Sequence, residues 1–371
     1  MPFPPLVAPA SALPDGESER AARQIRLPEI GEDGQRRLSA ARVCVIGAGG
    51  LGSPTLLYLA SAGIGTICIV DDDVVDTSNL QRQVLFGVAD VGRLKGHVAS
   101  ERIRALSPHT TVVREHERLT AGNAERILAG FDLVIDGSDT FDTRYAVADA
   151  CDALGVPLVW GSVLRFDAQA TVFWSRPPHG EPVRLRDVFP TAPPAEDVPT
   201  CADAGVLGAL CGQVGALLAA EAVKLICGIG DPIVGRMLVI DALSARTREV
   251  PLVPASVTAP ASVTAHAPRA VARTIAPEDL DRLDDLLLLD VREDDEFRAG
   301  SIPGAVSIPL GRLRADPSIV VVDRPVVVFC QIGPRARAAA SALRAVAPDA
   351  EILLLDGGYQ AWSAGASADH A

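Results

Sequence analysis

The sequence contains few aromatic residues: Phe, Trp and Tyr make up 4% of the chain, although hydrophobic residues make up 48%. The core of any folded domain must therefore be mostly aliphatic. Basic residues are also scarce relative to acidic ones, 34 Lys and Arg against 47 Asp and Glu, which gives a formal net charge of −13. This balance excludes a broad surface for nucleic acid or for an anionic membrane, so any phosphate-binding site must be local.

Long hydrophobic runs and paired cysteines are missing too. We find no apolar run of 18 or more residues, so we expect no membrane-spanning segment. Residues 1–14 are apolar, but they lack a basic segment and contain several prolines, so we interpret residues 1–19 as a disordered tail and not as a signal peptide. The seven cysteines never form a CxxC pair, which favours a reducing, cytoplasmic location over a disulfide-stabilised fold.

The sequence pattern predicts two domains of the α/β class. From about residue 20 to residue 252, strand-like runs alternate with helical stretches, which predicts a mostly parallel sheet. Residues 253–272 are rich in Pro, Ala, Ser, Thr and Val and repeat the motif PASVTA, so we expect a linker there. Residues 273–371 alternate strands and helices again, and they predict a smaller α/β domain.

A glycine-rich motif follows the first expected strand. In RVCVIGAGGLGSP (42–54), Gly47, Gly49 and Gly52 form G-x-G-x-x-G between a strand and a helix. Glycines let the backbone approach a phosphate, and the free N–H groups at the helix start attract the anion. Asp71 ends the next strand, where an acid would bind ribose hydroxyls. An oxidoreductase that uses NAD or FAD is therefore one hypothesis.

The residues after the second strand favour phosphate chemistry over hydride transfer. Arg and Lys neutralise phosphate oxygens, and a carboxylate can hold Mg²⁺, as the cleavage of a triphosphate requires. Asp139 ends a later strand, so we expect it at the same crevice along the carboxyl edge of the sheet. The segment 71–96 holds a dense set of polar side chains that includes Asp71, Asp73, Asn79, Arg82 and Lys95.

The stretch GAGGLGSPTLLYLASAGIGTICIVDDDVVDTSNLQRQ (47–83) resembles the MoeB/ThiF family, bacterial relatives of ubiquitin-activating enzymes, and the resemblance covers about residues 20–252. It implies a Rossmann-like domain that uses ATP to adenylate the C-terminal glycine of a ubiquitin-like sulfur carrier ending in Gly-Gly. Arg82 and Lys95 would act on the phosphates, and Asp139 would hold Mg²⁺ transiently. With the glycine motif, the implied ATP-binding residues are Gly47, Gly49, Gly50, Gly52, Asp71, Asp73, Ser78, Asn79, Leu80, Gln81, Arg82, Lys95, Asp139 and Thr140.

The same resemblance implies a homodimer in which an N-terminal arginine enters the ATP site of the partner subunit. The segment RAARQIRLPEIGEDGQ (20–35) matches that part of the family, so Arg20 and Arg23 are the candidates. This chain has Ala21 where the family often has tyrosine, and Thr140 where asparagine is usual. Both departures leave the charged groups in place.

The lack of paired cysteines that could bind zinc is a larger departure from the family. Many members carry two CxxC pairs that hold a structural Zn²⁺, whereas the corresponding segment here, EPVRLRDVFP (181–190), has no cysteine. Because tetrahedral zinc needs four closely spaced ligands, we expect no zinc site. In this loss and in its layout, the chain resembles the actinobacterial fused members called MoeZ or MoeBR.

The cysteine of PTCADAGVLGALCG (199–212) precedes an expected helix. The helix dipole at Cys201 would lower the pKa of its thiol, and relatives keep a cysteine at this point of the loop that crosses the adenylate. Some of them use it for a covalent intermediate, so Cys201 is a candidate catalytic cysteine. The alternative is that it is a small buried side chain with no role in catalysis. Four other cysteines of this domain lie in apolar patterns, and we expect them in the core: Cys44, Cys68, Cys211 and Cys227.

The C-terminal segment resembles the rhodanese family over most of its length. LLLLDVREDDEFRAGSIPGAVSIPLGRL (286–313) and LDGGYQAW (355–362) match its motifs, with Ser301 where histidine is common. Between them, Cys330 follows a strand and precedes a helix. Backbone N–H groups and the helix start would stabilise a thiolate or a persulfide anion there, and Arg335, with Arg337, would add positive charge. A structural cysteine at a strand end is the alternative.

The length of this loop separates sulfur transfer from phosphatase chemistry. Phosphatase loops of a related fold place five residues between Cys and Arg, whereas four intervene here. The shorter pocket suits a sulfur atom better than a phosphate. The expected persulfide loop consists of Cys330, Gln331, Ile332, Gly333, Pro334 and Arg335.

These observations predict an adenylyltransferase joined to a sulfurtransferase. Cys330 would take sulfur from a cysteine desulfurase persulfide or from thiosulfate and deliver it to the adenylated carrier, giving a thiocarboxylate. Two alternatives stay open: a dinucleotide oxidoreductase with a rhodanese appendage, and an adenylating enzyme whose rhodanese module is not catalytic.

Overall fold

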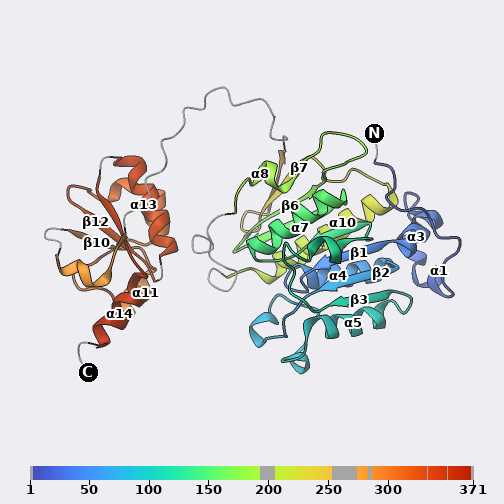
Figure 1. Ribbon diagram of the computed structural model, residues 1–371, viewed down its shortest axis with the longest axis horizontal. Coiled ribbons are helices and arrows are strands. Elements are labelled where there is room, and N and C mark those ends of the chain that lie inside the picture. The colour runs from blue at the N-terminus through green and yellow to red at the C-terminus, as the bar shows by residue number, and fades with distance from the viewer. Residues whose placement is uncertain are drawn as a thin grey trace. The chain divides into compact units, whose positions relative to one another are not determined.

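The computed structural model describes residues 3–192, 205–252, 274–282, 286–331, 333–348 and 350–368. These residues form two compact units, one up to Leu252 and one from Thr274 onward (Figure 1). The linker expected at 253–272, Cys201 and Ile332 lie outside the described residues. The α/β class expected for both segments is confirmed.

The first unit is built on an eight-stranded sheet with the order β3-β2-β1-β4-β5-β6-β7-β8. Strands β3 to β5 in this order pair in parallel, and β5 to β8 pair antiparallel. The strands span Arg42–Ile46 (β1), Thr66–Val70 (β2), Thr111–Glu115 (β3), Leu133–Asp136 (β4), Leu158–Leu164 (β5), Asp167–Phe173 (β6), Arg236–Asp241 (β7) and Arg246–Pro251 (β8).

Helices cover both faces of this sheet (Figure 1). Because side chains alternate along a strand, Val43 and Val45 of β1 join the cluster beneath α4 and α10, and Cys44 and Ile46 join the cluster beneath α6 and α7. The core is aliphatic, as its composition requires. The α-helices span Glu17–Arg20 (α1), Ala22–Ile25 (α2), Gly31–Ala40 (α3), Gly52–Ala62 (α4), Lys95–Leu106 (α5), Ala124–Leu128 (α6), Phe141–Leu154 (α7), Leu185–Val188 (α8) and Gly208–Cys227 (α10).

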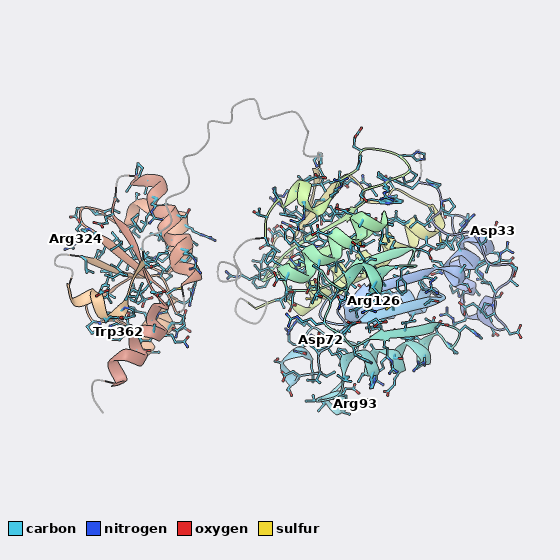
Figure 2. The ribbon with its side chains drawn as sticks, viewed as in Figure 1. Asp33, Asp72, Arg93, Arg126, Arg324 and Trp362 are labelled. Atoms are coloured by element: carbon cyan, nitrogen blue, oxygen red, sulfur yellow. The ribbon has the colours of Figure 1, made fainter. Side chains whose placement is uncertain are left out.

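Charged side chains lie on the outside of the first unit. Asp33, Arg93 and Arg126 project from its surface (Figure 2). The charges are thus carried on a solvated surface around an aliphatic interior.

Residues 3–19 are packed against this unit, so the prediction of a disordered tail over residues 1–19 is wrong for them. The ring of Phe3 stacks on Trp174 at 6.0 Å, and Val7 is buried. The backbone N–H of Leu6 donates to the Leu225 carbonyl at 3.1 Å. Apolar side chains between prolines bury themselves on the domain surface instead of remaining in water, which composition alone did not reveal.

Helix α10 is long and apolar enough to span a membrane, which the sequence analysis did not anticipate. Most of its apolar window is buried inside the first unit, where the helix packs on α4 and β5. Buried residues recur along it, among them Val214, Leu218 and Leu225. This is the pattern of a central core helix.

The second unit has a five-stranded parallel sheet with the order β11-β10-β12-β13-β9. The strands span Thr274–Ile275 (β9), Leu287–Asp290 (β10), Val306–Ser307 (β11), Val326–Phe329 (β12) and Ile352–Leu355 (β13). The α-helices span Asp294–Ala299 (α11), Leu310–Ala315 (α12), Pro334–Val346 (α13) and Gly358–Ala368 (α14).

Candidate functional site

The glycine motif forms a tight turn between β1 and α4. Gly47 has φ +82°, a conformation that favours glycine. A Cβ on Gly52 would lie 1.8 Å from the carbonyl oxygen of Gly47, so no larger residue fits there without moving the backbone. This close packing sets the start of α4 next to the end of β1, with the helix N–H groups directed at the crevice.

Replacing Gly52 with alanine is expected to lower the free energy of unfolding by about 1–3 kcal/mol, because the added methyl must displace the backbone of Gly47. The same change should weaken ATP binding. Gly212→Ala is the matched control: a Cβ at this helical position meets nothing within 4 Å, so it should be neutral or stabilise by up to about 1 kcal/mol. Thermal unfolding and ATP titration measure both effects, and equal behaviour of the two variants would contradict this account of the turn.

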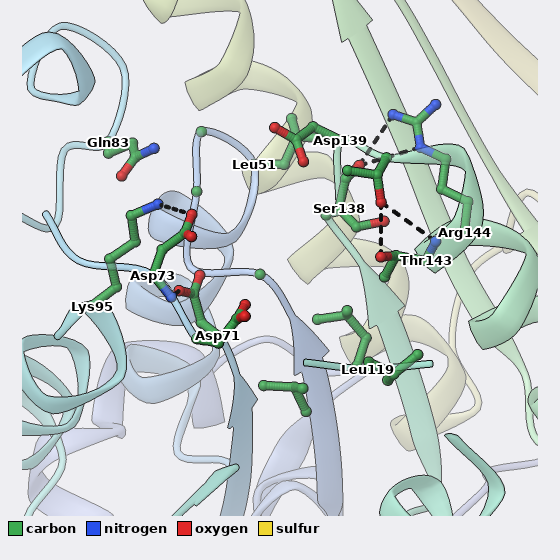
Figure 3. Close-up of a pocket in the computed structure, with 18 of the residues that line it drawn as sticks. Leu51, Asp71, Asp73, Gln83, Lys95, Leu119, Ser138, Asp139, Thr143 and Arg144 are labelled. Carbon is green, nitrogen blue, oxygen red and sulfur yellow. Dashed lines mark hydrogen bonds and ion pairs between the residues drawn. The ribbon is translucent and has the colours of Figure 1, made fainter. Parts of the chain in front are cut away.

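A cavity of about 230 Å³ opens at the carboxyl ends of β1, β2 and β4 (Figure 3). It lies where a parallel sheet reverses its strand order, which is the usual place for a ligand in such a fold. The expected ATP-binding residues that line it are Gly47, Gly49, Gly50, Asp71, Asp73, Arg82, Lys95, Asp139 and Thr140.

The other expected ATP-binding residues do not line this cavity; they shape the segments around it. The Asn79 side chain accepts from the Asp76 backbone and caps a short 3₁₀ helix. Leu80 packs against the core, and the Ser78 carbonyl accepts from Arg82 at 3.0 Å. Gly52 and Gln81 also lie outside the lining.

Asp71 is held rigidly at the end of β2. Its carboxylate accepts from the backbone N–H of Ala48 at 2.7 Å and of Asp73 at 3.0 Å. Burial raises the pKa of Asp71, while these two hydrogen bonds and the charge of Lys95 oppose the rise. The carboxylate therefore connects the glycine loop to the next strand and is placed to accept hydroxyl groups of a ribose.

The cationic side of the cavity is provided by Lys95 and Arg82. Lys95 begins α5 and its side chain is almost fully buried, with Nζ 2.8 Å from Oδ2 of the exposed Asp73 (Figure 3). A buried ammonium whose single carboxylate partner lies in solvent can exchange that partner for a phosphate oxygen.

Asp139 lies across the cavity, after β4 (Figure 3). Its side chain is exposed and makes no hydrogen bond or ion pair with the described residues. An exposed carboxylate beside a phosphate site fits Mg²⁺, which keeps several waters and takes few protein ligands. The Thr140 hydroxyl accepts from the backbone N–H of Thr143 and caps α7, so this side chain fixes the start of the helix.

Several residues that were not predicted also line the cavity, among them Gln83, Arg144 and Cys211. Gln83 is buried, and its Oε1 has no hydrogen-bond partner among the described residues, which suits a ligand-facing amide. Arg144 donates to the Ser138 carbonyl. Cys211, expected in the core, is buried and also lies in the lining, beside Gly50. Gln83 is the last residue of the stretch 47–83 that carries the family resemblance, and Arg144 follows Asp139 by five residues, so their closeness in sequence to predicted site residues was the available signal.

The two dimer candidates differ in their surroundings. Arg20 binds the buried carboxylate of Glu17 through Nε at 2.7 Å and Nη2 at 2.5 Å, and it also donates to the Ser61 carbonyl. It is therefore engaged in its own subunit. Arg23 is exposed and has no polar partner among the described residues. Neither arginine lines the cavity.

The thiol of Cys330 lies in the loop between β12 and α13 and is buried. Its Sγ accepts from the backbone N–H of Gly333 at 3.1 Å. The Tyr359 N–H donates to the Cys330 carbonyl at 2.8 Å, and a Cβ on Gly358 would lie 2.4 Å from that carbonyl oxygen. The Gly-Gly turn at 357–358 is thus required for the close approach of α14 to the loop.

Two arginines support this loop, and each has a carboxylate partner. Arg292 is buried on Asp290 and donates to Oε1 of Gln331 at 3.1 Å, and Arg335 forms a two-fold pair with Glu296 at 2.5 and 2.8 Å. The positive charge expected from Arg335 at the thiol is therefore largely offset. Ser301, which stands where histidine is common, donates to Asp290 at 2.7 Å.

No group of three or more His, Cys, Asp or Glu side chains is arranged to hold a metal ion in the part of the chain that the structure describes. The prediction that zinc is absent was based on residues 181–190, which contain no cysteine. These residues follow β6 and include α8. Any Mg²⁺ would depend on Asp139 together with oxygens of the nucleotide.

Both units match known protein families. Residues 21–260 match the ThiF family, and residues 276–365 match the rhodanese-like domain. The chain belongs to the ThiF family. It is 45% identical to the probable adenylyltransferase/sulfurtransferase MoeZ of Mycobacterium tuberculosis, over 97% of this chain and 96% of that protein. The resemblances to the MoeB/ThiF and rhodanese families are confirmed.

Two further comparisons cover about two thirds of this chain. The sulfur carrier protein adenylyltransferase of Thermus thermophilus is 49% identical over 63% of this chain and 87% of that protein. The crystal structure of PaaA has a TM-score of 0.54 at 22% identity, over 66% of this chain and 76% of that chain, and it shares the fold. A ThiF domain followed by a rhodanese-like domain fits the activation of a sulfur carrier and the transfer of sulfur to it.

Proposed function

We propose that this enzyme adenylates the C-terminal glycine of a ubiquitin-like sulfur carrier and then transfers sulfur to it from Cys330. The observation that supports this most directly is the cavity in which Lys95, Arg82 and Asp139 surround a glycine loop, in a chain that also carries a protected thiol. The relatives named adenylyltransferase/sulfurtransferase and sulfur carrier protein adenylyltransferase support it independently.

In the first step, ATP lies along the glycine loop with its ribose on Asp71. The carboxylate of the carrier attacks the α-phosphorus, the bond to the β-phosphate oxygen breaks, and pyrophosphate leaves. Lys95 and Arg82 donate to oxygens whose negative charge increases during this step. Asp139 would hold Mg²⁺, which supplies further charge neutralisation.

In the second step, Cys330 carries a persulfide, and Gly333 donates to the sulfur. The terminal sulfur attacks the acyl-adenylate carbonyl, and AMP leaves. This gives an acyl disulfide between the carrier and Cys330. A thiolate then attacks the Cys330 sulfur, releases the carrier thiocarboxylate and forms a disulfide that a cellular dithiol reduces. Cys201 is the candidate for that thiolate, and a reducing cytoplasm is the compartment in which such a cycle can run.

A homodimer with an arginine supplied in trans gives a direct prediction. Arg23→Ala is expected to lower ATP–pyrophosphate exchange by about 10²-fold or more, because it removes a cation that touches the phosphates. Arg20→Ala is expected instead to lower the free energy of unfolding by about 1–3 kcal/mol, because it leaves the Glu17 carboxylate buried without its cationic partner.

Mixing two inactive variants tests the exchange between subunits. Mixed dimers of Arg23→Ala and Lys95→Ala contain one site with both wild-type groups, so activity should return on mixing. If the mixture stays inactive although mixed dimers form, Arg23 does not act in trans.

The two alternatives make different predictions. An oxidoreductase would turn over a pyridine or flavin nucleotide without a carrier; the names of the relatives give it no support. A silent rhodanese domain would leave thiocarboxylate formation intact after loss of Cys330. Intact-mass analysis of candidate Gly-Gly carriers with ATP and a sulfur donor decides among them. A carrier that gains one sulfur in place of oxygen identifies the substrate, and no gain with any carrier would overturn the proposal.

A further inference from the structure

Arg335 is the arginine that closes the loop around Cys330, and both of its terminal nitrogens bind the carboxylate of Glu296. Nη1 binds Oε2 of Glu296 at 2.5 Å and Nη2 binds Oε1 at 2.8 Å. The two side chains are partly buried to a similar extent, 32% and 30% exposed. A guanidinium edge filled by a carboxylate in this two-fold geometry cannot hold a second oxyanion in the same way.

Glu296 is fixed in this position by its own helix. It is the third residue of α11, and its Oε2 also accepts from the backbone N–H of Glu293 at 3.0 Å. The hydrogen bond from Arg335 is the main cause that lowers the pKa of Glu296, so the carboxylate is charged at neutral pH. The pairing is thus part of the packed domain, and it brings together residues 39 positions apart.

The two candidate sulfur donors differ in charge where they would meet Arg335. Thiosulfate is a dianion whose sulfonate group needs N–H donors beside the thiol. A persulfide presents a terminal sulfur on a carbon-bound sulfur, with no sulfonate group. Arg292, a second arginine at the loop, is bound to Asp290 and Gln331. Gly333 already donates to the sulfur of Cys330, as a persulfide requires, whereas the sulfonate of thiosulfate would have to compete with Glu296 for the face of Arg335 that Glu296 binds.

We propose that Glu296 determines the choice of sulfur donor: by occupying Arg335 it disfavours thiosulfate and leaves Cys330 to accept sulfur from a persulfide. This inference rests on the proposed sulfur transfer at Cys330. The Cys330 thiolate attacks the terminal sulfur of R–S–SH, the S–S bond breaks, and R–S⁻ leaves. Cys330 then carries –S–SH; the transfer needs no external oxidant or reductant.

The test compares wild type and Glu296→Gln in the full chain, without ATP or carrier. Thiosulfate and glutathione persulfide serve as donors, and thiocyanate formation from cyanide and the mass of the protein are the readouts. We expect Glu296→Gln to raise kcat/KM for thiosulfate about fivefold to tenfold, mainly through a lower KM, as expected for the release of one partly exposed ion pair. The rate with glutathione persulfide should stay within about twofold.

Asp295→Asn is the matched control, because Asp295 is an exposed residue of the same helix and has no polar partner among the described residues. It removes the same charge and should change neither donor. The double variant Glu296→Gln/Arg335→Gln should lose the gain with thiosulfate. An unchanged thiosulfate rate in Glu296→Gln, an equal gain in Asp295→Asn, or a parallel loss with both donors would overturn the inference. If the wild type takes sulfur from neither donor, this result contradicts the proposed sulfur transfer at Cys330 as well as the role of Glu296.

Discussion

Replacing Cys330 with serine is expected to abolish thiocarboxylate formation while ATP–pyrophosphate exchange stays at the wild-type rate. A hydroxyl cannot carry a sulfane sulfur, so the second step has no substitute. The first step depends on residues of the other unit, around Lys95 and Asp139. Cys330 is the single cysteine among residues 273–371, so no neighbouring thiol of that domain can take over. Intact-mass analysis of the carrier measures the product, and radiolabelled pyrophosphate measures exchange.

The same assay distinguishes the two cysteines. If Cys201 releases the product, Cys201→Ser should trap the carrier as an acyl disulfide on Cys330, visible as a covalent adduct that a reductant removes. If Cys201→Ser forms free thiocarboxylate at the wild-type rate, Cys201 has no part in release. Residual thiocarboxylate in Cys330→Ser would mean that sulfur reaches the adenylate without the rhodanese-like domain.

Replacing Lys95 with alanine is expected to lower ATP–pyrophosphate exchange by about 10²–10³-fold, because a preorganised, nearly buried ammonium is removed from the phosphate side of the cavity. Lys95→Arg should recover part of the activity, since the charge remains but its position changes. The loss should appear in kcat more than in KM for ATP if Lys95 acts mainly on charge that develops during the reaction.

Arg104→Ala is the matched control for Lys95. Arg104 lies on the same helix, is exposed, and has no polar partner among the described residues. Its loss should leave exchange unchanged. Sulfur transfer from a donor to cyanide should also be unchanged in Lys95→Ala, because that reaction needs only the second unit. A Lys95→Ala enzyme with wild-type exchange would show that another group neutralises the phosphates.

The chemistry-bearing motifs could be predicted because they are local. The G-x-G-x-x-G turn, the acid at the end of the next strand and the cysteine between a strand and a helix each depend on residues close together in sequence. Parallel strands bring their carboxyl ends to one edge, so placing Asp71, Lys95 and Asp139 together needed no detailed structure. Gln83 was missed because a buried amide without a partner is visible only after packing.

Ion pairs and docked segments could not be predicted in the same way. The sequence shows that Arg20 and Arg23 are candidates for one role, but only the fold pairs Arg20 with the buried Glu17 and leaves Arg23 exposed. The docking of residues 3–19 likewise depends on surfaces provided by α10 and α3.

By itself, the sequence determined the fold class, the order of the ThiF and rhodanese-like segments, the glycine turn between β1 and α4 and the position of the Cys330 thiol between a strand and a helix, because each is set by local backbone geometry and hydrophobic periodicity. The tertiary structure alone decided what surrounds that thiol. The loop motif predicts a cation at Arg335, whereas the packing of α11 against the loop supplies Glu296 and offsets the charge. Arg335 and Glu296 lie 39 positions apart in the sequence, so the balance of their charges exists only in the folded chain.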